Sequence, residues 1–334
     1  MEEEGIAFEA NGLFYNPHMR LSRTLSSLAL STLPPMDILD GFCASGIRGI
    51  RYAKENGAKS LAFVDWSRKA IAISLSNAKA NGIDAQGFVS DFNRHVLSSS
   101  YSFYELDPFG SPSQHIYPAL YSCSYLKASY LSITATDLAV LCGKEREALA
   151  RNYLAFNTTN DYCHESAARI VIGFAVRLAG IMGLSFTPLL TFYYRHQIKV
   201  IGKVEKGKLK AYESEAKVGM LGPIGPLWLG DLHDRETLQK MAEENNRRSY
   251  TDKERVAKML SLMEGELGTL PFFYSLHSLS SSAKLAAIPK MASLLEAIKA
   301  QGYYAVQTHF SPLGIRTDMP EKEVIALMKN LSPA

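Results

Sequence analysis

Asp107, Pro108 and Phe109 are residue types that suit methyl transfer to an amino group on a nucleobase. The lone pair of such an amine is delocalised into the ring, so the nitrogen is a weak nucleophile. Hydrogen bonds from its N–H groups to the Asp107 carboxylate and the Pro108 carbonyl would favour the tetrahedral nitrogen that forms as positive charge develops. Asp107 would also take the proton, and an extruded base would stack on Phe109. We predict these three residues as catalytic; the alternative is a turn that Asp107 only caps.

A second candidate site is the segment from Asp40 to Gly49, which follows an expected strand and opens an expected helix. Open α/β sheets bind nucleotides at such a turn, where small residues let a ligand approach the backbone. The dinucleotide motif G-x-G-x-x-G needs glycine where Ala44 stands, which argues against a pyrophosphate. We predict Asp40 and Gly46 as cofactor-binding residues. The alternative is a tight turn that only lets the helix and strand pack.

Acidic residues also end the next two expected strands, at the same edge of the sheet. Asp65 suits two ribose hydroxyls, since both can donate to one carboxylate. Asp91 would accept from an adenine amino group, with the Phe92 ring against the face of the base. Each acid alone is equally compatible with a helix N-cap. Together, the three strand ends favour a cofactor that contains adenosine.

A sheet with helices on both faces is needed to bring these residues to one edge. Short apolar runs alternate with helical patterns through the first two-thirds of the chain, which is typical of a doubly wound α/β domain. The expected strands are residues 37–40, 61–65, 86–90, 102–106 and 130–135. The expected helices are residues 47–56, 68–80 and 114–123.

The next part of the chain predicts a long apolar helix over residues 164–182 and two strands over 186–194 and 197–204, which can complete the same sheet as an antiparallel pair. Residues 222–226, Gly-Pro-Ile-Gly-Pro, predict a turn-rich connector, followed by helices and a last strand at 303–306. We therefore divide the chain into domains 1–225 and 226–334.

Composition limits the class of protein. The chain has 334 residues, of which 47% are hydrophobic and 21% charged, with a net charge of +3; this is ordinary globular usage. The start Met1-Glu2-Glu3-Glu4 is unlike a signal peptide, and Arg169 and Arg177 interrupt the most apolar helix. We expect a cytoplasmic protein without membrane contact. The four cysteines form no C-x-x-C pair, so neither a disulfide framework nor a thiolate zinc site is expected.

Further motifs accompany the string Asp107-Pro108-Phe109-Gly110-Ser111-Pro112. They are Phe14-Tyr15-Asn16-Pro17 with Arg23, Ala44-Ser45-Gly46-Ile47-Arg48-Gly49-Ile50-Arg51, Thr134-Ala135-Thr136-Asp137, Leu141-Cys142-Gly143, Tyr162-Cys163-His164-Glu165, Gly225-Pro226-Leu227-Trp228 and Thr308-His309-Phe310. With these, the chain resembles the tRNA guanine-26 N2-dimethyltransferases along most of its length.

The resemblance implies a Rossmann-like class I methyltransferase domain and a smaller α+β domain that positions tRNA. It also implies S-adenosylmethionine as cofactor, with Asp107 as the catalytic acceptor. The residues implied to hold the cofactor are Arg23, Arg48, Asp65, Asp91 and Phe92. The two arginines make physical sense as partners of the methionine carboxylate, because a carboxylate accepts a fork of donors.

The chain departs from the family pattern in two places. Many members carry a four-cysteine zinc site in the stretch that corresponds to residues 212–221, which here contains no cysteine. We therefore expect no metal. Gln307 stands where members usually have arginine, so one phosphate contact is expected to be missing.

Other chemistry-bearing residues are interpreted as structural. His164-Glu165 lacks the second histidine of H-E-x-x-H, because Ala168 stands there; Cys142 and Cys163 have no spacing partner. Two basic stretches are candidate RNA surfaces or ordinary solvated faces. They are a hairpin with Lys199, Lys203, Lys206, Lys208, Lys210 and Lys217, and a helical stretch with Arg247, Arg248, Lys253, Arg255 and Lys258.

The sequence thus predicts a monomeric enzyme that transfers one or two methyl groups from S-adenosylmethionine to N2 of guanine 26 in tRNA. The nearest alternative is the same chemistry on another base, such as adenine N6 in DNA or RNA. An RNA-binding module without activity is an alternative from another class. An NAD-dependent oxidoreductase would have no use for the Asp107-Pro108-Phe109 string.

Overall fold

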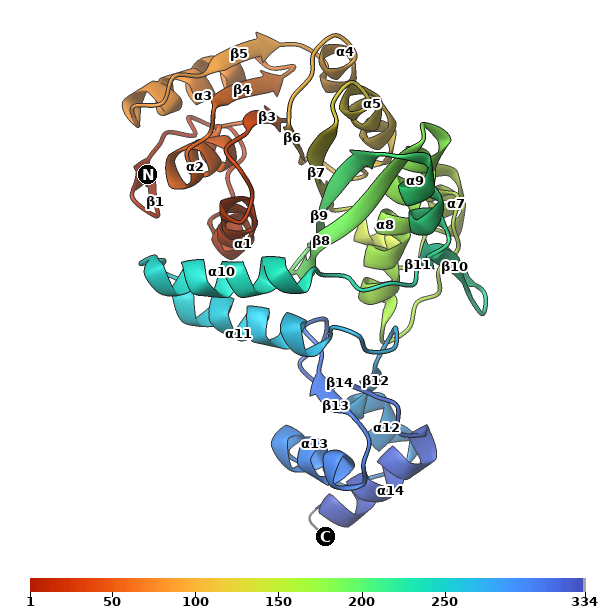
Figure 1. Cartoon of the computed structure of the whole chain (residues 1–334). Helices are drawn as coiled ribbons and strands as arrows, with labels where there is room; N and C mark the ends of the chain where they lie inside the picture. The colour runs from red at the N-terminus through yellow and green to blue at the C-terminus, as the bar shows by residue number, and fades with distance from the viewer. Residues whose placement is uncertain (333–334) are drawn as a thin grey trace.

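A seven-stranded sheet forms the centre of the molecule (Figure 1). The structure is a computed structural model and describes residues 1–332. The strand order is β5-β4-β3-β6-β7-β9-β8; the first five strands are parallel, and β9 runs antiparallel to both of its neighbours. The antiparallel pair predicted to complete the sheet is therefore confirmed. The strands are β3 Asp37–Gly41, β4 Ser60–Asp65, β5 Gln86–Val89, β6 Phe103–Leu106, β7 Ala128–Ala135, β8 Leu184–Tyr194 and β9 Gln197–Lys206.

Helices cover both faces of this sheet. Because side chains alternate along a strand, Ile38 and Phe63 join one hydrophobic core while Leu39 and Val64 join the other. The first core is closed by α1 Arg20–Ser31, α2 Ile47–Asn56 and α3 Arg68–Ala80, and the second by α4 Phe92–Val96, α5 Ser113–Cys123 and α8 Cys163–Ile181. This is the doubly wound arrangement that the alternating pattern predicts.

A hairpin replaces the predicted connector at residues 222–226. Strands β10 Val218–Leu221 and β11 Ile224–Trp228 pair antiparallel, so only Gly222 and Pro223 form the turn and the prediction was wrong from Ile224 on. The hairpin packs on α8, where a Cβ at Gly173 would lie 3.1 Å from the Leu227 Cα. Smaller elements complete this part: β1 Glu2–Glu3, β2 Ile6–Ala7, η1 Pro17–Met19, α6 Leu138–Leu141, α7 Arg146–Tyr153 and α9 Lys208–Glu215.

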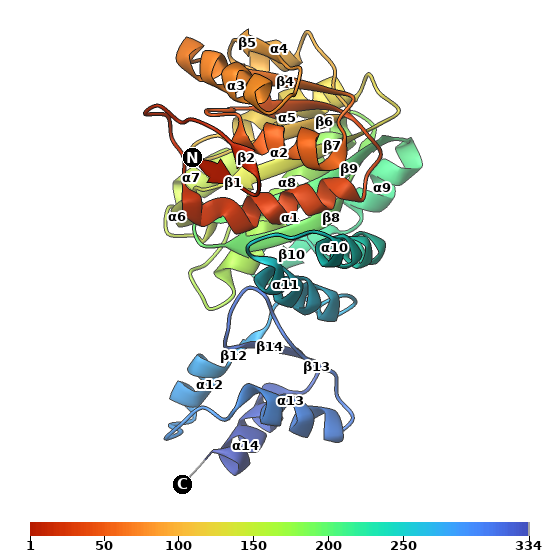
Figure 2. The same ribbon diagram turned by 90° about the vertical axis from the view of Figure 1, so that its left-hand side faces the viewer.

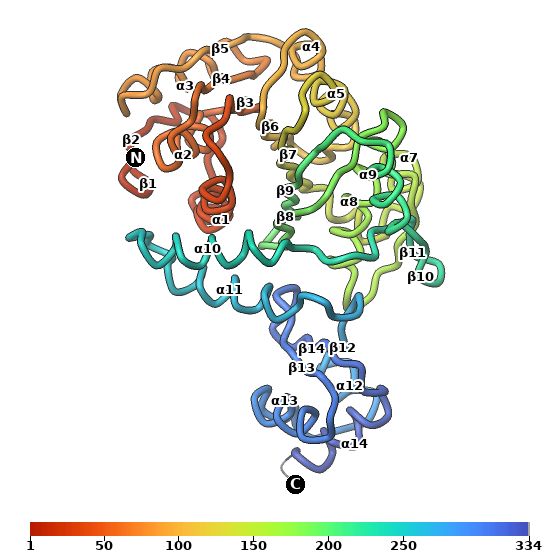
Figure 3. Tube along the Cα trace, viewed as in Figure 1, coloured from red at the N-terminus to blue at the C-terminus, as the bar shows by residue number. Residues whose placement is uncertain are grey.

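Two helices and a separate small layer follow. Helices α10 Arg235–Arg247 and α11 Lys253–Gly265 lie against α1 and share its core, as Figure 2 shows. A third core joins the three-stranded sheet β12-β14-β13 to α12, α13 and α14 at the far end of the molecule (Figure 3). These elements are β12 Tyr274–Ser275, α12 Leu276–Ser282, α13 Met291–Ala300, β13 Ala305–Gln307, β14 Gly314–Thr317 and α14 Glu321–Leu331.

The division of the chain at residue 225 stays a prediction. The third core, which contains no residue of the seven-stranded sheet, begins only at Leu276. Among residues 1–332, no helix combines the length and apolar character needed to cross a membrane.

Candidate active site

Asp107 follows β6 directly and lies at the carboxyl edge of the central sheet. Its Oδ2 accepts a hydrogen bond from Nη2 of Arg48 at 2.6 Å, and Arg48 comes from the first turn of α2. Burial raises the pKa of Asp107, but the charges of Arg48 and Lys199 outweigh it and hold that pKa below its ordinary value. Asp107 is therefore ionised at neutral pH, the state that accepts a hydrogen bond from an amine.

A buried ion pair lies beneath Asp107. Lys199 of β9 bonds to Glu105 of β6, and both side chains are fully buried. The Lys199 ammonium also donates to Oγ1 of Thr134 at 2.8 Å, and the Tyr52 hydroxyl donates to Glu105 at 2.8 Å. Lys199 was predicted to belong to an exposed basic hairpin, which is wrong, because this network satisfies its charge inside the protein. The remaining lysines of that stretch are exposed or half-buried.

Asp40, at the end of β3, is buried beside this network. Its Oδ2 accepts from the amide of Gly49 at 2.9 Å, in the first turn of α2. Burial raises the pKa of Asp40 to about 8, and the nearby Glu105 charge adds to the increase. The carboxyl group is thus mostly protonated at neutral pH. Asp40 is at the predicted edge, but its hydrogen bond supports the turn.

The glycines of the turn from Asp40 to Gly49 are required by packing. A Cβ at Gly46 would lie 2.8 Å from the Ser74 Cβ, and Gly46 has φ of +76°. A Cβ at Gly49 would lie 2.8 Å from Asp40 Oδ2. Phe42 and Ala44 also have positive φ, of 59° and 47°, a costly conformation for residues with a side chain. Packing alone thus accounts for Gly46 and Gly49, and the cofactor role of Gly46 stays a prediction.

The acids at the ends of β4 and β5 both support local turns. Asp65 accepts from the amides of Ser67 at 2.9 Å and Ala44 at 3.2 Å. Asp91 is exposed and caps α4 by accepting from the amide of Arg94 at 3.0 Å. Carboxylate oxygens have further lone pairs, so both groups can still accept from a ligand.

Two aromatic residues near these acids differ from expectation. The Phe92 ring is buried and stacks on Phe42 with centroids 5.1 Å apart, so Phe42 covers part of this ring and its contact with a base stays a prediction. Trp66, directly after Asp65, is 88% exposed. Trp66 directly follows Asp65, which is predicted to accept from ribose hydroxyls, but no role was predicted for Trp66 from the sequence.

Phe109 presents an exposed ring next to Asp107. Its side chain is 83% exposed and meets Phe14, which is 62% exposed, edge to face with centroids 5.2 Å apart. Thr136 Oγ1 accepts from the amide of Gly110 at 2.8 Å and so holds the loop to the end of β7. Phe14 was noted only as part of a motif. The structure brings the Phe14 ring into contact with the predicted catalytic residue Phe109.

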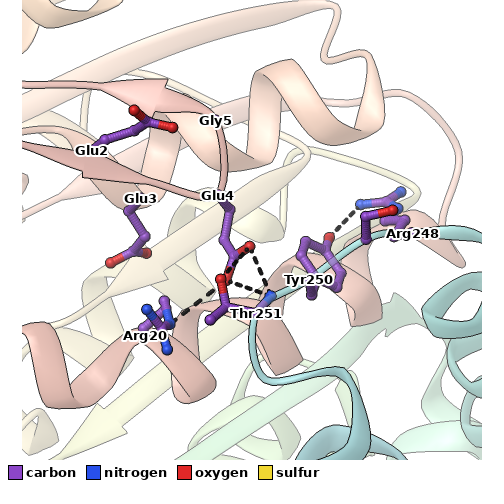
Figure 4. A pocket seen from close by; sticks show the side chains of 9 residues that line it. Glu2, Glu3, Glu4, Gly5, Arg20, Arg248, Tyr250 and Thr251 are labelled. Carbon is purple, nitrogen blue, oxygen red and sulfur yellow. Dashed lines mark hydrogen bonds and ion pairs between the residues drawn. The ribbon is translucent and has the colours of Figure 1, made fainter.

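Arg23 of α1 pairs with Glu3. Its Nε donates to Glu3 Oε1 at 2.8 Å, and Arg51 donates to the same oxygen at 3.0 Å. A neighbouring hollow between the N-terminal strands and the segment 248–251 is lined by Glu2, Glu3, Glu4, Gly5, Arg20, Arg248, Ser249, Tyr250 and Thr251 (Figure 4). Several of its charged groups pair with one another, as in the ion pair between Arg20 and Glu4. The predicted contact of Arg23 with a cofactor stays a prediction.

The second basic stretch is mixed in character. Arg248 points inward and donates to Glu244 of α10 and to Glu55 of α2. It therefore holds the end of α10 to the main domain. Arg247, Arg255 and Lys258 are exposed. They remain candidates for contact with a polyanion.

The doubly wound sheet, with acids at three strand ends and an Asp-Pro-Phe loop after the fourth, defines a class I methyltransferase fold. The chain belongs to the N2,N2-dimethylguanosine tRNA methyltransferase family, whose model matches residues 1–223 and 220–329. It is 34% identical to the tRNA (guanine(26)-N(2))-dimethyltransferase of Thermococcus kodakarensis over 96% of this chain and 93% of that protein. For the Archaeoglobus fulgidus protein of the same name, the identity is 30% over 98% of each.

A solved structure has the same arrangement over nearly the whole chain. It is Trm1 from Pyrococcus horikoshii in complex with S-adenosyl-L-methionine, which is similar to this chain with a TM-score of 0.87 and 31% identity over 97% of both chains. The similarity includes the smaller C-terminal part.

Proposed function

We propose that this protein transfers methyl groups from S-adenosylmethionine to N2 of guanine 26 in tRNA. One observation carries the proposal: an ionised Asp107 lies beside the exposed Phe109 and Phe14 rings, at the edge where the strand-end acids gather. The relatives that cover almost the whole chain bear the name of this activity.

Asp107, Pro108 and Phe109 act on the guanine amine. S-adenosylmethionine supplies an electrophilic methyl group on a positively charged sulfur. The Asp107 carboxylate and Pro108 carbonyl accept from the N–H groups, which orients the nitrogen lone pair and stabilises the positive charge that develops on it. Asp107 then takes the proton. Phe109 and Phe14 provide apolar faces for a base that has left its stack.

The residues around Arg48 are compatible with a cofactor that has a carboxylate, a ribose and an adenine. Nη1 of Arg48 is buried and has no hydrogen-bond partner within residues 1–332, so one donor of a buried cation is available to a carboxylate. Asp65 would accept from the ribose hydroxyls and Asp91 from the adenine amino group. Asp40, Gly46 and the backbone at Phe92 would shape the turn, and Arg23 would donate to the carboxylate from Nη1, since Nε and Nη2 are engaged by Glu3.

The tRNA would lie across the mouth at Phe109 and the exposed basic residues. Arg247, Arg255 and Lys258 on α10 and α11, together with Lys206, Lys208 and Lys210, would contact phosphates. Residues 226–334 would position the tRNA. We further propose that the protein works as a monomer in the cytoplasm.

Nucleoside mass spectrometry tests the proposal. The protein is incubated with an unmodified tRNA transcript and isotope-labelled S-adenosylmethionine, and the digested nucleosides are identified. Label in N2-methylguanosine or N2,N2-dimethylguanosine is expected, together with its loss when guanine 26 is replaced by adenine. Label in another nucleoside would favour the same chemistry on another base. Retention of tRNA without any label would favour an RNA-binding module and contradict the proposal.

A further inference from the structure

Two thiols and an imidazole that are separate in sequence meet at the start of α8. One ligand atom from each of Cys142, Cys163 and His164 lies within 4.8 Å of the other two. Cys142 follows α6 and Cys163 begins α8, and both are almost fully buried, while His164 is half-buried. None of the three takes part in the methyl-transfer steps argued above.

Local backbone contacts build this meeting point. Gly143 has φ of +81°, and a Cβ there would lie 2.5 Å from the carbonyl oxygen of Asn157, so only glycine lets the two loops touch. The Asn157 amide donates to the Leu141 carbonyl at 2.7 Å, and its Oδ1 accepts from Ser166 at 2.9 Å. These bonds fix the end of α6 against the start of α8, and the two cysteines with them.

The imidazole is also held in place. The His164 ring stacks on Tyr193 of β8 with centroids 4.0 Å apart and 16° between the planes. A neutral imidazole has a lone pair on one of its two ring nitrogens. An oriented neutral imidazole is the form that ligates a metal.

We propose that Cys142, Cys163 and His164 bind a zinc ion. Zinc takes thiolate and imidazole ligands in a tetrahedron, in which sulfurs about 2.3 Å from the metal are about 3.8 Å apart, within the observed limit. Two thiolates balance the charge of the ion. Three protein ligands leave a fourth position for a water molecule. Because His164 is half-buried, we expect this fourth position to lie near solvent.

The charges around the cluster support this choice of ligands. Cys163 is the first residue of a 19-residue helix, whose N-terminus favours a thiolate. Glu165, two residues on, is occupied by Arg169 at 2.9 Å and Arg316 at 2.9 Å, so it does not compete for the ion. The proposal departs from the expectation of no metal, which rested on the lack of a C-x-x-C pair and on the absence of cysteine from residues 212–221.

The site lies between two parts of the molecule that a metal would hold together. Helix α6 follows Thr136, which bonds to Gly110 in the loop that carries Phe109. Tyr162, beside Cys163, stacks on Phe272 with centroids 4.4 Å apart, where the chain enters the C-terminal core. Zinc binding would therefore stiffen the connection between the catalytic loop and the C-terminal part.

Cobalt substitution of the full-length protein tests the proposal. The reduced protein is stripped with a chelator and titrated with Co²⁺, then with Zn²⁺ in competition. We expect one equivalent of Co²⁺ to give a thiolate-to-cobalt charge-transfer band and the intense visible bands of a tetrahedral site, both abolished by Zn²⁺. Absence of both bands in the reduced protein overturns the proposal. It is also overturned if Cys142 and Cys163 are found only as a disulfide in the protein as purified.

Variants assign the ligands. Cys142→Ala, Cys163→Ala and His164→Gln should each weaken zinc binding by about 100-fold or more, since even the loss of a residue that only orients a metal ligand costs about 10- to 100-fold. Cys123→Ala is the matched control, because Cys123 is also buried but lies on α5, and it should keep the affinity. If a cysteine variant fails to fold, His164→Gln decides alone. Unchanged affinity in His164→Gln, or equal loss in Cys123→Ala, contradicts the assignment.

Discussion

Arg48 and Asp107 form one unit: Nη2 of the arginine lies 2.6 Å from Oδ2 of the aspartate, while Nη1 of the same guanidinium has no partner within residues 1–332. The arginine therefore orients the carboxylate and keeps it ionised, and it still has a donor directed elsewhere. This links the proposed cofactor site to the proposed acceptor of the proton.

Replacement of Asp107 by asparagine should remove methyl transfer and spare cofactor binding. Asparagine keeps the size of the side chain, but its amide cannot take the proton, a contribution of about 10²- to 10⁴-fold. We expect kcat to fall by at least about 100-fold, while the Kd for S-adenosylhomocysteine changes little. Asp84→Asn, at an exposed position, is the control and should match the unmodified protein. A kcat within threefold of the unmodified protein would remove Asp107 from the mechanism.

The pH dependence of kcat/KM should report the charge of Arg48. Burial raises the pKa of Asp107, and the Arg48 charge does most to reverse that effect. In Arg48→Gln this pKa rises, so the carboxylate is protonated at a higher pH and the acid limb of the profile moves upward. Arg146→Gln, an exposed arginine on α7, should leave the limb in place. An unmoved limb in Arg48→Gln would show that another group controls the rate.

Trp66 should report cofactor binding by fluorescence. The chain has two tryptophans; Trp66 is 88% exposed beside Asp65, and Trp228, the last residue of β11, is 3% exposed. A nucleoside near Asp65 changes the solvent around Trp66 only. We expect S-adenosylhomocysteine to change the emission of the unmodified protein and of Trp228→Phe, but not that of Trp66→Phe. A response that persists in Trp66→Phe would place the ligand elsewhere.

Loss of one partner of the buried ion pair between Lys199 and Glu105 should destabilise the protein more than loss of both charges. Lys199→Met leaves an unpaired buried carboxylate and should lower the free energy of unfolding by about 3–5 kcal/mol, whereas the double change with Glu105→Gln should recover much of that loss. Lys203→Met is the matched control four residues along β9, where the ion pair with Glu205 is partly exposed and the cost is below about 1 kcal/mol. Denaturant unfolding of the unmodified protein and the three variants measures these differences. No recovery in the double variant would contradict the reasoning.

Sequence alone predicted the sheet because its strands obey local rules. Apolar runs of four to six residues ending in Asp40, Asp65 and Asp107 carry both the strand and its functional end. Helix α1 was not predicted, since its buried residues include serines. Ser26 returns its hydrogen bond to the Ser22 carbonyl at 2.9 Å and Ser27 bonds to Glu55 at 2.6 Å, so their burial depends on partners that hydrophobicity does not reveal.

Long-range pairing explains the remaining differences. A lysine in a strand is expected to be exposed. Lys199 is buried because Glu105, 94 residues earlier in the sequence, neutralises its charge. Cys142 and Cys163 are 21 residues apart and meet through the approach of Gly143 to Asn157. Motif spacing can detect metal ligands that lie on one helix or loop. Cys142 and Cys163 belong to two separate elements, so their spacing gives no such signal.

Asp40 gives the stability of the protein a characteristic pH dependence. Burial raises its pKa from 3.8 to about 8 in the folded protein, so between these values the folded state binds more protons than the unfolded state. The contribution to stability is therefore present below pH 4 and is lost as the pH rises through 8. Buried histidines such as His233, whose pKa is lowered to about 3, act in the opposite direction near their unfolded pKa of about 6.5.

The difference between the protein and its Asp40→Asn variant isolates this effect, because the histidine contributions cancel. Asparagine can still accept from the Gly49 amide and carries no charge at any pH. We expect the variant to gain stability relative to the unmodified protein as the pH is raised from about 6 to about 9, measured as the free energy of unfolding in denaturant. Asp84→Asn should show no such gain. A constant difference across this range would mean that the Asp40 carboxyl is already ionised at neutral pH in the folded protein.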